Sequence, residues 1–378
     1  MNWILEVLQD LESHSLRRSL KKIKYISDRT ILINEKKIVE FCSNDYLGLS
    51  HHPKVIEAAQ NALQKYGLGS GASRLITGNH IYYEELEHNI AQFKNTQASI
   101  VFSSGYAANL GIISSLVGKG DIVFFDRLSH ASLIDGCRLS QARHHSYEHN
   151  DINRLGKLLR KYRHEFKNCL ILTEGIFSMD GDIASIPDLI KLAEDYNAFL
   201  LVDEAHSTGV LGENGRGVLE FFKISNKPYV LLMGTLSKAL GALGGFLAAT
   251  QTVIDLVLNK ARSLIYSTAL PPAICCGANM ALKLIQSDNR LIRKLHTNIK
   301  IFSEKKLSPI IPVIAGSAPK ALITQQELFK NGFFLPAIRY PTVPKGTDRI
   351  RISISSMHTK KQILQLKLLL QKLKLNYE

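Results

Sequence analysis

The sequence predicts an α/β fold built around a mostly parallel sheet, and three observations support this prediction. From residue 98 onward, short apolar segments alternate with segments of helical period. The apolar segments are continuous, as in FLLV at 199–202, which is typical of strands covered on both faces of a parallel sheet. Polar residues follow directly where these segments end, and open α/β sheets bind ligands at the carboxyl ends of their strands.

The expected elements place this sheet in the middle of the chain. Strands are expected at 99–103, 122–126, 169–174, 198–203, 229–234 and 244–250, and helices at 105–117, 131–141, 151–164 and 187–196. An amphipathic helix over 3–22, strands at 30–33 and 37–41, and helices over 53–66 and 81–94 precede them. A helix over 273–298, strands near 311–314, 333–338 and 349–355, and a helix over 360–375 follow. We therefore expect an N-terminal segment (1–45), a large α/β domain (46–272) and a small C-terminal domain (273–378).

The composition favours a cytoplasmic protein that does not contact a membrane. The chain has 378 residues, its apolar runs are far shorter than a bilayer span, and its first residues carry acids rather than a signal-peptide pattern. Its five cysteines are scattered without a CxxC pair, which predicts reduced thiols, no disulfide framework, and no zinc or other metal site.

The net charge of +14 bears on the partners of the protein. No basic stripe interleaves with aromatic residues, so we expect no nucleic-acid partner. The charge fits either solvated helix faces or an acidic ligand, such as a coenzyme A thioester or an acidic carrier protein.

The segment LLMGTLSKALGALGG at 231–245 contains a lysine, Lys238, shortly after a buried strand. A poorly solvated ammonium group has a lowered pKa, which makes it a nucleophile able to form a Schiff base. The alternative is an ordinary lysine in a surface loop.

The segment LLVDEAH at 200–206 has two interpretations. With Phe199, four apolar residues precede DEAH, which is typical of the acidic metal-binding strand of nucleic-acid helicases. Such an enzyme also needs an upstream G-x-x-x-x-G-K-[ST] loop, which the sequence lacks. In the other interpretation, Asp203 pairs with a heterocyclic N–H⁺ and His206 bonds a neighbouring oxygen.

Three further strand ends carry polar residues. SSGYAAN at 103–109 begins a helix, whose free N–H groups suit an anion or an ordinary helix cap. His130 could stack on an aromatic ring, or it is a capping or core histidine. Ser178 could donate to a phosphate, and Glu174 could orient the site. The helix start at 103–109, His130, Asp203 and Lys238 together provide the groups that pyridoxal 5′-phosphate requires.

The sequence resembles the α-oxoamine synthase family of fold-type I pyridoxal-phosphate enzymes over nearly its whole length. The resemblance rests on SNDYLGLSHHP, GSGASR, SGYAAN, DRLSHASLIDG, TEGIFSMDGD, VDEAHSTGVLGENGRG, GTLSKALGALGG, YSTALPPA and AIRYPTVPKGTDRIRIS. It implies a large domain with a mostly parallel seven-stranded sheet and a smaller α+β C-terminal domain.

The resemblance also implies roles for individual residues. Lys238 binds the cofactor aldehyde as an imine, Asp203 pairs with the pyridine nitrogen, His206 bonds the ring oxygen and His130 stacks on the ring; these are the expected catalytic residues. Further cofactor contacts are implied for Gly105, Tyr106, Ser178 and Thr235, and for Ser267 and Thr268 across the interface of a homodimer with shared active sites. Substrate contacts are implied for Lys21, Asn44, His130, Arg339 and Thr342, and Lys21 stands where the family as a rule carries an arginine.

The implied reaction is a decarboxylative condensation of L-alanine with a pimeloyl thioester, carried by coenzyme A or by an acyl-carrier protein, in biotin biosynthesis. Glycine C-acetyltransferase, 5-aminolevulinate synthase and serine palmitoyltransferase are alternatives that share this chemistry. A DEAH-type nucleic-acid NTPase and a catalytically silent relative that binds the cofactor are alternatives from other classes.

Overall fold

The larger of two units of the chain is built on a seven-stranded sheet, which confirms the predicted fold class. The strands lie in the order β4-β10-β9-β8-β7-β5-β6, and only β10 runs antiparallel to its neighbours, β9 and β4. The structure, a computed structural model, describes residues 2–27 and 29–377, and this unit comprises Leu47–Ser178 and Asp182–Arg293. The strands are β4 (Ala98–Phe102), β5 (Ile122–Asp126), β6 (Arg143–Tyr147), β7 (Cys169–Glu174), β8 (Phe199–Asp203), β9 (Val230–Thr235) and β10 (Gly245–Ala249).

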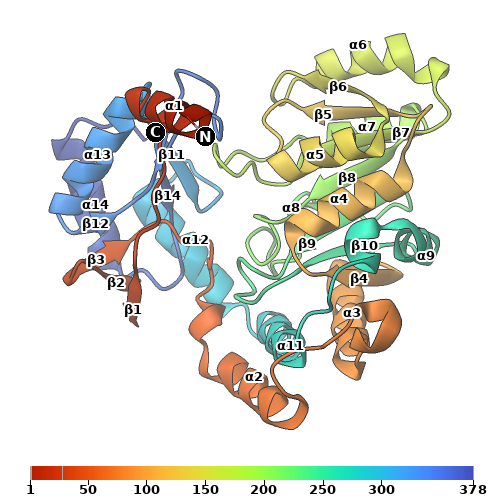
Figure 1. The fold of residues 1–378 in the computed structure, drawn as a ribbon, viewed down its shortest axis with the longest axis horizontal. Coiled ribbons are helices and arrows are strands. Elements are labelled where there is room, and N and C mark those ends of the chain that lie inside the picture. The colour runs from red at the N-terminus through yellow and green to blue at the C-terminus, as the bar shows by residue number, and fades with distance from the viewer. Residues whose placement is uncertain (1, 28, 378) are drawn as a thin grey trace. The chain divides into compact units, whose positions relative to one another are not determined.

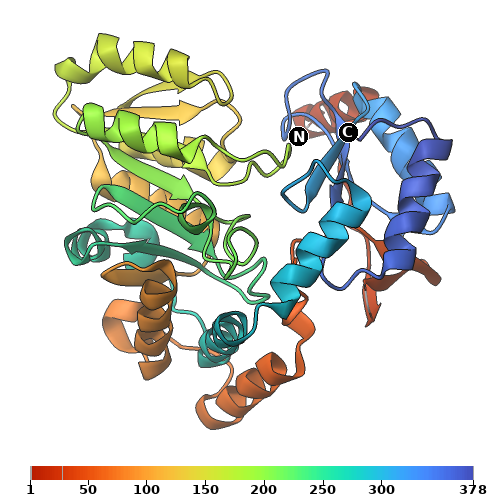
Figure 2. The same cartoon turned by 180° about the vertical axis from the view of Figure 1, so that it is seen from behind.

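Helices cover both faces of this sheet. In Figure 1, α4 (Gly105–Leu116) and α5 (Ala131–Ser140) lie across one face, and Figure 2 shows α6 (Ile152–Tyr162) and α7 (Ile186–Asp195) across the other. The remaining helices of the unit are α2 (Pro53–Tyr66), α3 (Ile81–Lys94), α8 (Val218–Phe221), α9 (Gln251–Lys260), α10 (Arg262–Ile265) and α11 (Pro272–Ser287), with single turns of 3₁₀ or π helix at Leu49–His51, Arg74–Gly78 and Arg163–Glu165.

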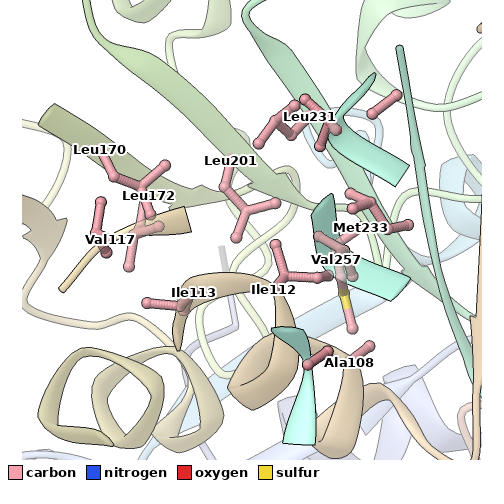
Figure 3. Close-up of a cluster of buried hydrophobic side chains, with 14 of the residues drawn as sticks. Ala108, Ile112, Ile113, Val117, Leu170, Leu172, Leu201, Leu231, Met233 and Val257 are labelled. Atoms are coloured by element: carbon pink, nitrogen blue, oxygen red, sulfur yellow. The ribbon is translucent and has the colours of Figure 1, made fainter. Parts of the chain in front are cut away.

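Buried aliphatic side chains fill the space between this sheet and α4. Leu170 and Leu172 of β7 and Leu201 of β8 pack against a cluster that includes Ile112 and Ile113 (Figure 3). The strand residues of this cluster alternate along the chain, because successive side chains of a strand point to opposite faces of the sheet. Burying each such side chain stabilises the fold by roughly 1.5–3 kcal/mol, so this layer fixes the position of α4 firmly.

The smaller unit combines helices with two small sheets, as expected of an α+β domain. It comprises Met1–Tyr46, Met179–Gly181 and Lys294–Glu378. The sheets have the strand orders β1-β2-β3-β12 and β11-β14-β13, and only the β3–β12 pair is parallel. Its strands are β1 (Lys24–Ser27), β2 (Thr30–Ile33), β3 (Lys36–Glu40), β11 (Ile310–Ile314), β12 (Phe333–Phe334), β13 (Ala337–Ile338) and β14 (Arg349–Ser353). Its helices are α1 (Asn2–Ser13), α13 (Ala318–Lys330) and α14 (Lys360–Lys372), and α12 (Arg290–Phe302) begins in the larger unit.

Two helix predictions are wrong in extent. The helix expected over 3–22 ends at Ser13, because the chain turns at Ser15, which has a left-handed φ of 56°. The helix expected over 273–298 is two helices, α11 and α12. Between them the carboxylate of Asp288 accepts a hydrogen bond of 2.9 Å from the N–H of Arg290 and so caps the start of α12.

Other elements carried no usable signal in the sequence. The edge strand β6 reads RHHSY and is largely exposed, so it lacks the apolar run of the other strands.

None of the helices formed by the described residues combines the length and apolarity needed to cross a bilayer.

In the larger unit, His149 lies between two carboxylates and links the end of β5 to the loops that follow β6 and β7. The Nδ1 of His149 lies 3.0 Å from a carboxylate oxygen of Asp126, and its Nε2 lies 2.8 Å from one of Asp182. Burial alone would lower the pKa of His149, but the hydrogen bonds and charges of Asp126 and Asp182 outweigh it and raise this pKa to about 10.

The charge on His149 should therefore stabilise the fold in a pH-dependent way. The pKa is raised above its unfolded value near 6.5, so the stabilisation is complete below about pH 6.5 and is lost as the pH rises to about 10. We expect His149→Gln to lower the free energy of unfolding by about 2 kcal/mol at pH 6, allowing for solvent screening, and by little at pH 10.5. Urea denaturation at both pH values measures this, with exposed His88→Gln as the control. An equal cost of His149→Gln at both pH values would refute the ion-pair interpretation.

Candidate active site

A cavity of about 230 Å³ lies at the carboxyl ends of the central strands of the larger unit. The sequence analysis singled out most of the residues that define it. The predicted residues that line it are Gly105, Tyr106, His130, Asp203, His206, Thr235 and Lys238.

The pleat of three neighbouring strands aims polar side chains at this cavity. Glu174 ends β7, Asp203 ends β8 and Thr235 ends β9. Each stands two residues after a member of the buried cluster beneath α4: Leu172, Leu201 or Met233. Because side chains two apart share a face, the alternation that builds the core also carries these three polar groups to the edge of the same layer.

Lys238 is held in a tight loop after β9. Two backbone hydrogen bonds, each 2.9 Å long, close the loop. The N–H of Leu236 donates to the carbonyl of Gly244, and the N–H of Gly241 donates to the carbonyl of Lys238. Gly241 has a φ of 65°, and a Cβ there would lie 2.2 Å from the amide nitrogen of Ser50, so only glycine fits. The loop brings the Nζ of Lys238 to 2.8 Å from the Nε2 of His206.

The carboxylate of Asp203 is buried, and each of its oxygens accepts one hydrogen bond and retains a lone pair. Its Oδ1 accepts a hydrogen bond of 2.9 Å from the N–H of Ala205, and its Oδ2 accepts one of 2.8 Å from the side-chain amide of Asn109. The same amide group donates to the hydroxyl of Ser132, which lies 2.8 Å from the Nδ1 of His130. A continuous hydrogen-bonded chain therefore links Asp203 to the ring of His130.

Burial sets the charge state of His130. It lowers the pKa of the imidazole, which the charge of Asp203 raises only in part. His130 is therefore neutral near pH 7 and presents an uncharged ring to the cavity. The ring of Tyr106 stands edge-on to it, with centroids 6.2 Å apart, and the hydroxyl of Tyr106 bonds the carboxylate of Asp135.

The start of α4 forms one wall of the cavity. Ser104 caps the helix by accepting a hydrogen bond of 3.1 Å from the N–H of Ala107. At Gly105, a Cβ would lie only 3.2 Å from the Cε of Met233, so glycine keeps the wall open. The exposed N–H groups and the helix dipole favour an anionic group here, next to the hydroxyl of Thr235.

Three predicted cofactor residues of the larger unit do not line the cavity. The side chain of Ser178 is buried beside it, and its N–H donates to the carboxylate of Glu174 over 3.1 Å. Ser267 and Thr268 follow α10, and Thr268 is exposed and forms an isolated β-bridge with Ser73.

The predicted substrate residues other than His130 belong to the smaller unit. Lys21 and Arg339 line one cavity there, of about 540 Å³. The side-chain oxygen of Asn44 accepts hydrogen bonds of 3.1 Å from Arg351 and 3.2 Å from the hydroxyl of Tyr46. Thr342 is exposed, and its N–H donates to the carbonyl of Arg339 over 3.0 Å.

Sequence reasoning gave no role to Asn109 and Ser132, which link Asp203 to His130. The signal for Asn109 was present, because it is a polar residue inside the apolar helix GYAANLGIISSL and a buried amide requires partners. Nothing in the sequence distinguished Ser132 from an ordinary residue of the first turn of a helix.

Comparisons with known proteins agree with this geometry. The model of the family "Aminotransferase class I and II" matches residues 36–367. An 8-amino-7-oxononanoate synthase of Geobacter sulfurreducens is 45% identical, over 93% of this chain and 92% of its own length. One of Thermoanaerobacter pseudethanolicus is 41% identical, over 96% and 94%.

Solved structures show the same similarity. A serine palmitoyltransferase from S. paucimobilis, with bound PLP-myriocin aldimine, superposes with a TM-score of 0.90 at 31% identity, over 98% of this chain and 96% of its own. An 8-amino-7-oxononanoate synthase from Francisella tularensis superposes with a TM-score of 0.76 at 36% identity, over 89% and 98%. The chain belongs to the class I and II aminotransferase family and, within it, to the group of the 8-amino-7-oxononanoate synthases.

Proposed function

We propose that the protein is a pyridoxal-phosphate-dependent acyltransferase that condenses L-alanine with a pimeloyl thioester. The products are 8-amino-7-oxononanoate, CO₂ and the free thiol. The observation that carries the proposal is one cavity lined by the amine of Lys238, the carboxylate of Asp203 and the neutral ring of His130. The names of the relatives, which cover almost the whole chain, supply the product, and L-alanine and a pimeloyl thioester are the substrates that the family resemblance implies.

The residues present fit pyridoxal 5′-phosphate. Asp203, His130, His206 and Lys238 would hold its ring and aldehyde, and the start of α4 with Thr235 would hold its phosphate. Gly105 leaves room there that a side chain would fill. When bound, the cofactor supplies an electron-accepting ring that stabilises a carbanion next to the substrate nitrogen.

The residues of the chain supply binding and proton transfer. The Nζ of Lys238 takes the α-proton of alanine, and His206, at 2.8 Å, orients this amine. The negative charge of Asp203 would stabilise a proton on a bound heterocyclic nitrogen, and the hydrogen bonds from Asn109 and Ala205 fix the orientation of the carboxylate. The neutral ring of His130 covers one side of the cavity and excludes water from it.

The structure argues against a DEAH-type motor. Glu204, which would have to face a metal ion and water in such an enzyme, is fully buried and forms an ion pair with Lys94. It also accepts a hydrogen bond of 2.7 Å from the N–H of Val218. Glu204 therefore has a structural role here.

The reaction is tested by thiol release from paired substrates. Alanine with pimeloyl-coenzyme A or a pimeloyl-carrier protein should release thiol faster than glycine with acetyl-coenzyme A. Lys238→Ala should lower the rate at least about a thousandfold and abolish the visible absorption of the bound cofactor, because no other amine can replace it. Lys260→Ala, on α9, is the control. The opposite substrate preference would reassign the protein to the glycine acetyltransferases.

Arg339 is proposed to bind the carboxylate of alanine. Its guanidinium donates to the backbone carbonyls of Ser15 and Arg17, and its Nε is buried without a hydrogen-bond partner among the described residues. A carboxylate is a suitable acceptor for such a donor.

Replacing the guanidinium tests this role of Arg339. Arg339→Lys keeps the charge but loses the planar fork, so we expect the KM for alanine to rise about ten- to a hundredfold. The KM for the acyl donor should change little. Steady-state kinetics with each substrate varied in turn measures both. A change confined to the acyl donor would place Arg339 at that substrate instead.

A homodimer with shared sites is also proposed. The exposed apolar side chains of Leu75 and Ile76 lie near Tyr266, since the bridge between Ser73 and Thr268 brings their segments side by side. Such a patch, next to the predicted phosphate contact Thr268, favours a second copy of the chain.

Complementation between two inactive variants tests the sharing. Thr268→Asp should repel the phosphate and inactivate the enzyme, as should Lys238→Ala. When equal amounts of the two variants are unfolded and refolded together, about half of the dimers should be mixed. Each mixed dimer has one intact site of two, so about a quarter of the wild-type activity should return. Light scattering measures the molecular mass in solution and so distinguishes a dimer from a monomer. A monomer, or a dimer without recovered activity, would refute shared sites.

A further inference from the structure

Glu174 is a buried carboxylate in the wall of the cavity to which the proposed reaction gives no task. It is only 2% exposed and stands opposite Asp203 in the register of β7 and β8. A second negative charge beside Asp203 is costly in a buried site, so its presence requires a compensating interaction.

The compensation comes from two backbone N–H groups on different loops. The Oε1 of Glu174 accepts a hydrogen bond of 2.7 Å from the N–H of His130, in the loop after β5. Its Oε2 accepts one of 3.1 Å from the N–H of Ser178, in the loop after β7. One side chain therefore bridges the histidine that covers the cavity and the serine proposed to contact the cofactor phosphate.

We propose that Glu174 is a positioning residue, which fixes His130 and Ser178 relative to each other so that the cavity is already shaped for the cofactor. This inference rests on the proposed function, because it takes pyridoxal 5′-phosphate as the ligand. Glu174 acts through its neighbours and takes no part in proton transfer to the substrate.

The geometry requires a carboxylate rather than an amide. Both oxygens of Glu174 accept a backbone N–H, whereas glutamine has one oxygen and would turn its NH₂ donor toward the other N–H. Several effects on the pKa of Glu174 oppose one another. Burial and the charge of Asp203 raise this pKa to about 8, while the charge of Lys238 and the hydrogen bonds from the two N–H groups act to lower it. With this pKa most Glu174 side chains carry a proton near pH 7, but the hydroxyl oxygen of the protonated form keeps a lone pair that can accept the second N–H, which the NH₂ of glutamine cannot do.

The chain contains a matched control for this bridge. The carboxylate of Asp121 accepts hydrogen bonds of 2.9 Å from the N–H of Gly118 and 3.0 Å from the N–H of Asn168. It joins two loops in the same way, but it precedes β5, at the opposite end of the strands, and lines no part of the cavity.

The test compares Glu174→Gln with Asp121→Asn. Both variants should unfold at a lower temperature than the wild type, because each leaves a backbone N–H without its acceptor. Titration of the apoprotein with pyridoxal 5′-phosphate, followed by absorption and by the induced circular dichroism of the cofactor, should separate them. We expect at least about tenfold weaker binding and an altered dichroic band for Glu174→Gln only.

Each outcome decides the proposal. Wild-type affinity and dichroism in Glu174→Gln would overturn it, as would an equal loss in Asp121→Asn, since that loss would reflect general destabilisation. If Glu174→Gln does not fold, amide hydrogen exchange of the wild-type apoprotein decides instead: slow exchange at His130 and Ser178 supports the bridge, and exchange at the rate of free loop amides refutes it. Failure of the wild type to bind the cofactor would refute the proposed function itself.

Discussion

The alternation of side chains along three parallel strands is the constraint on which the site depends. Leu172, Leu201 and Met233 face α4, so the residues two positions later on β7, β8 and β9 must face the same layer. A shift of one strand by one residue would move Asp203 to the other face of the sheet and would expose core leucines at the same time. The stability of the core and the placement of the polar groups at the cavity therefore rest on one register.

This arrangement buries several ionisable side chains, and each of them has hydrogen bonds or an ion pair. Asp203 is held by Ala205 and Asn109, and Glu174 by the N–H groups of His130 and Ser178. Just outside the cavity, Glu204 is neutralised by Lys94. Groups that are already hydrogen-bonded need little rearrangement when a ligand arrives, which is the usual advantage of a preorganised polar site.

The sequence was sufficient for the features that depend on local pattern. The bounds of β5, β7, α2 and α3 were predicted correctly, because continuous apolar strands and capped helices follow from nearby residues. The polar β6 and the short α8 and α10 were missed, since a strand at the edge of a sheet and a single helical turn have no clear period. Seven predicted residues share the cavity. His130, Asp203, His206 and Lys238 were singled out because they follow strands, whereas the roles of Gly105, Tyr106 and Thr235 came from the family resemblance.

Contacts between distant segments could not be predicted in this way. The pairing of Asn109 with Asp203 and Ser132 depends on how α4 packs against the sheet, as does the bridge from Glu174 to His130. Similarly, the hydrogen bonds of Arg339 to the carbonyls of Ser15 and Arg17 join residues from opposite ends of the chain. Such contacts are set by tertiary structure and leave no local pattern in the sequence.

The cavity around Lys238 explains a type of chemistry but not the choice of substrate. A lysine, an aspartate and a covering histidine serve any carbanion reaction of this cofactor, whatever acyl group is transferred. A serine palmitoyltransferase accordingly shares the fold with a TM-score of 0.90, although its name indicates another acyl chain. Because the fold is common to this chain and to that enzyme, selectivity must come from individual residues and not from the fold. Lys21 and Arg339, which we propose as substrate contacts, line a cavity of the smaller unit together with Arg17 and Arg18.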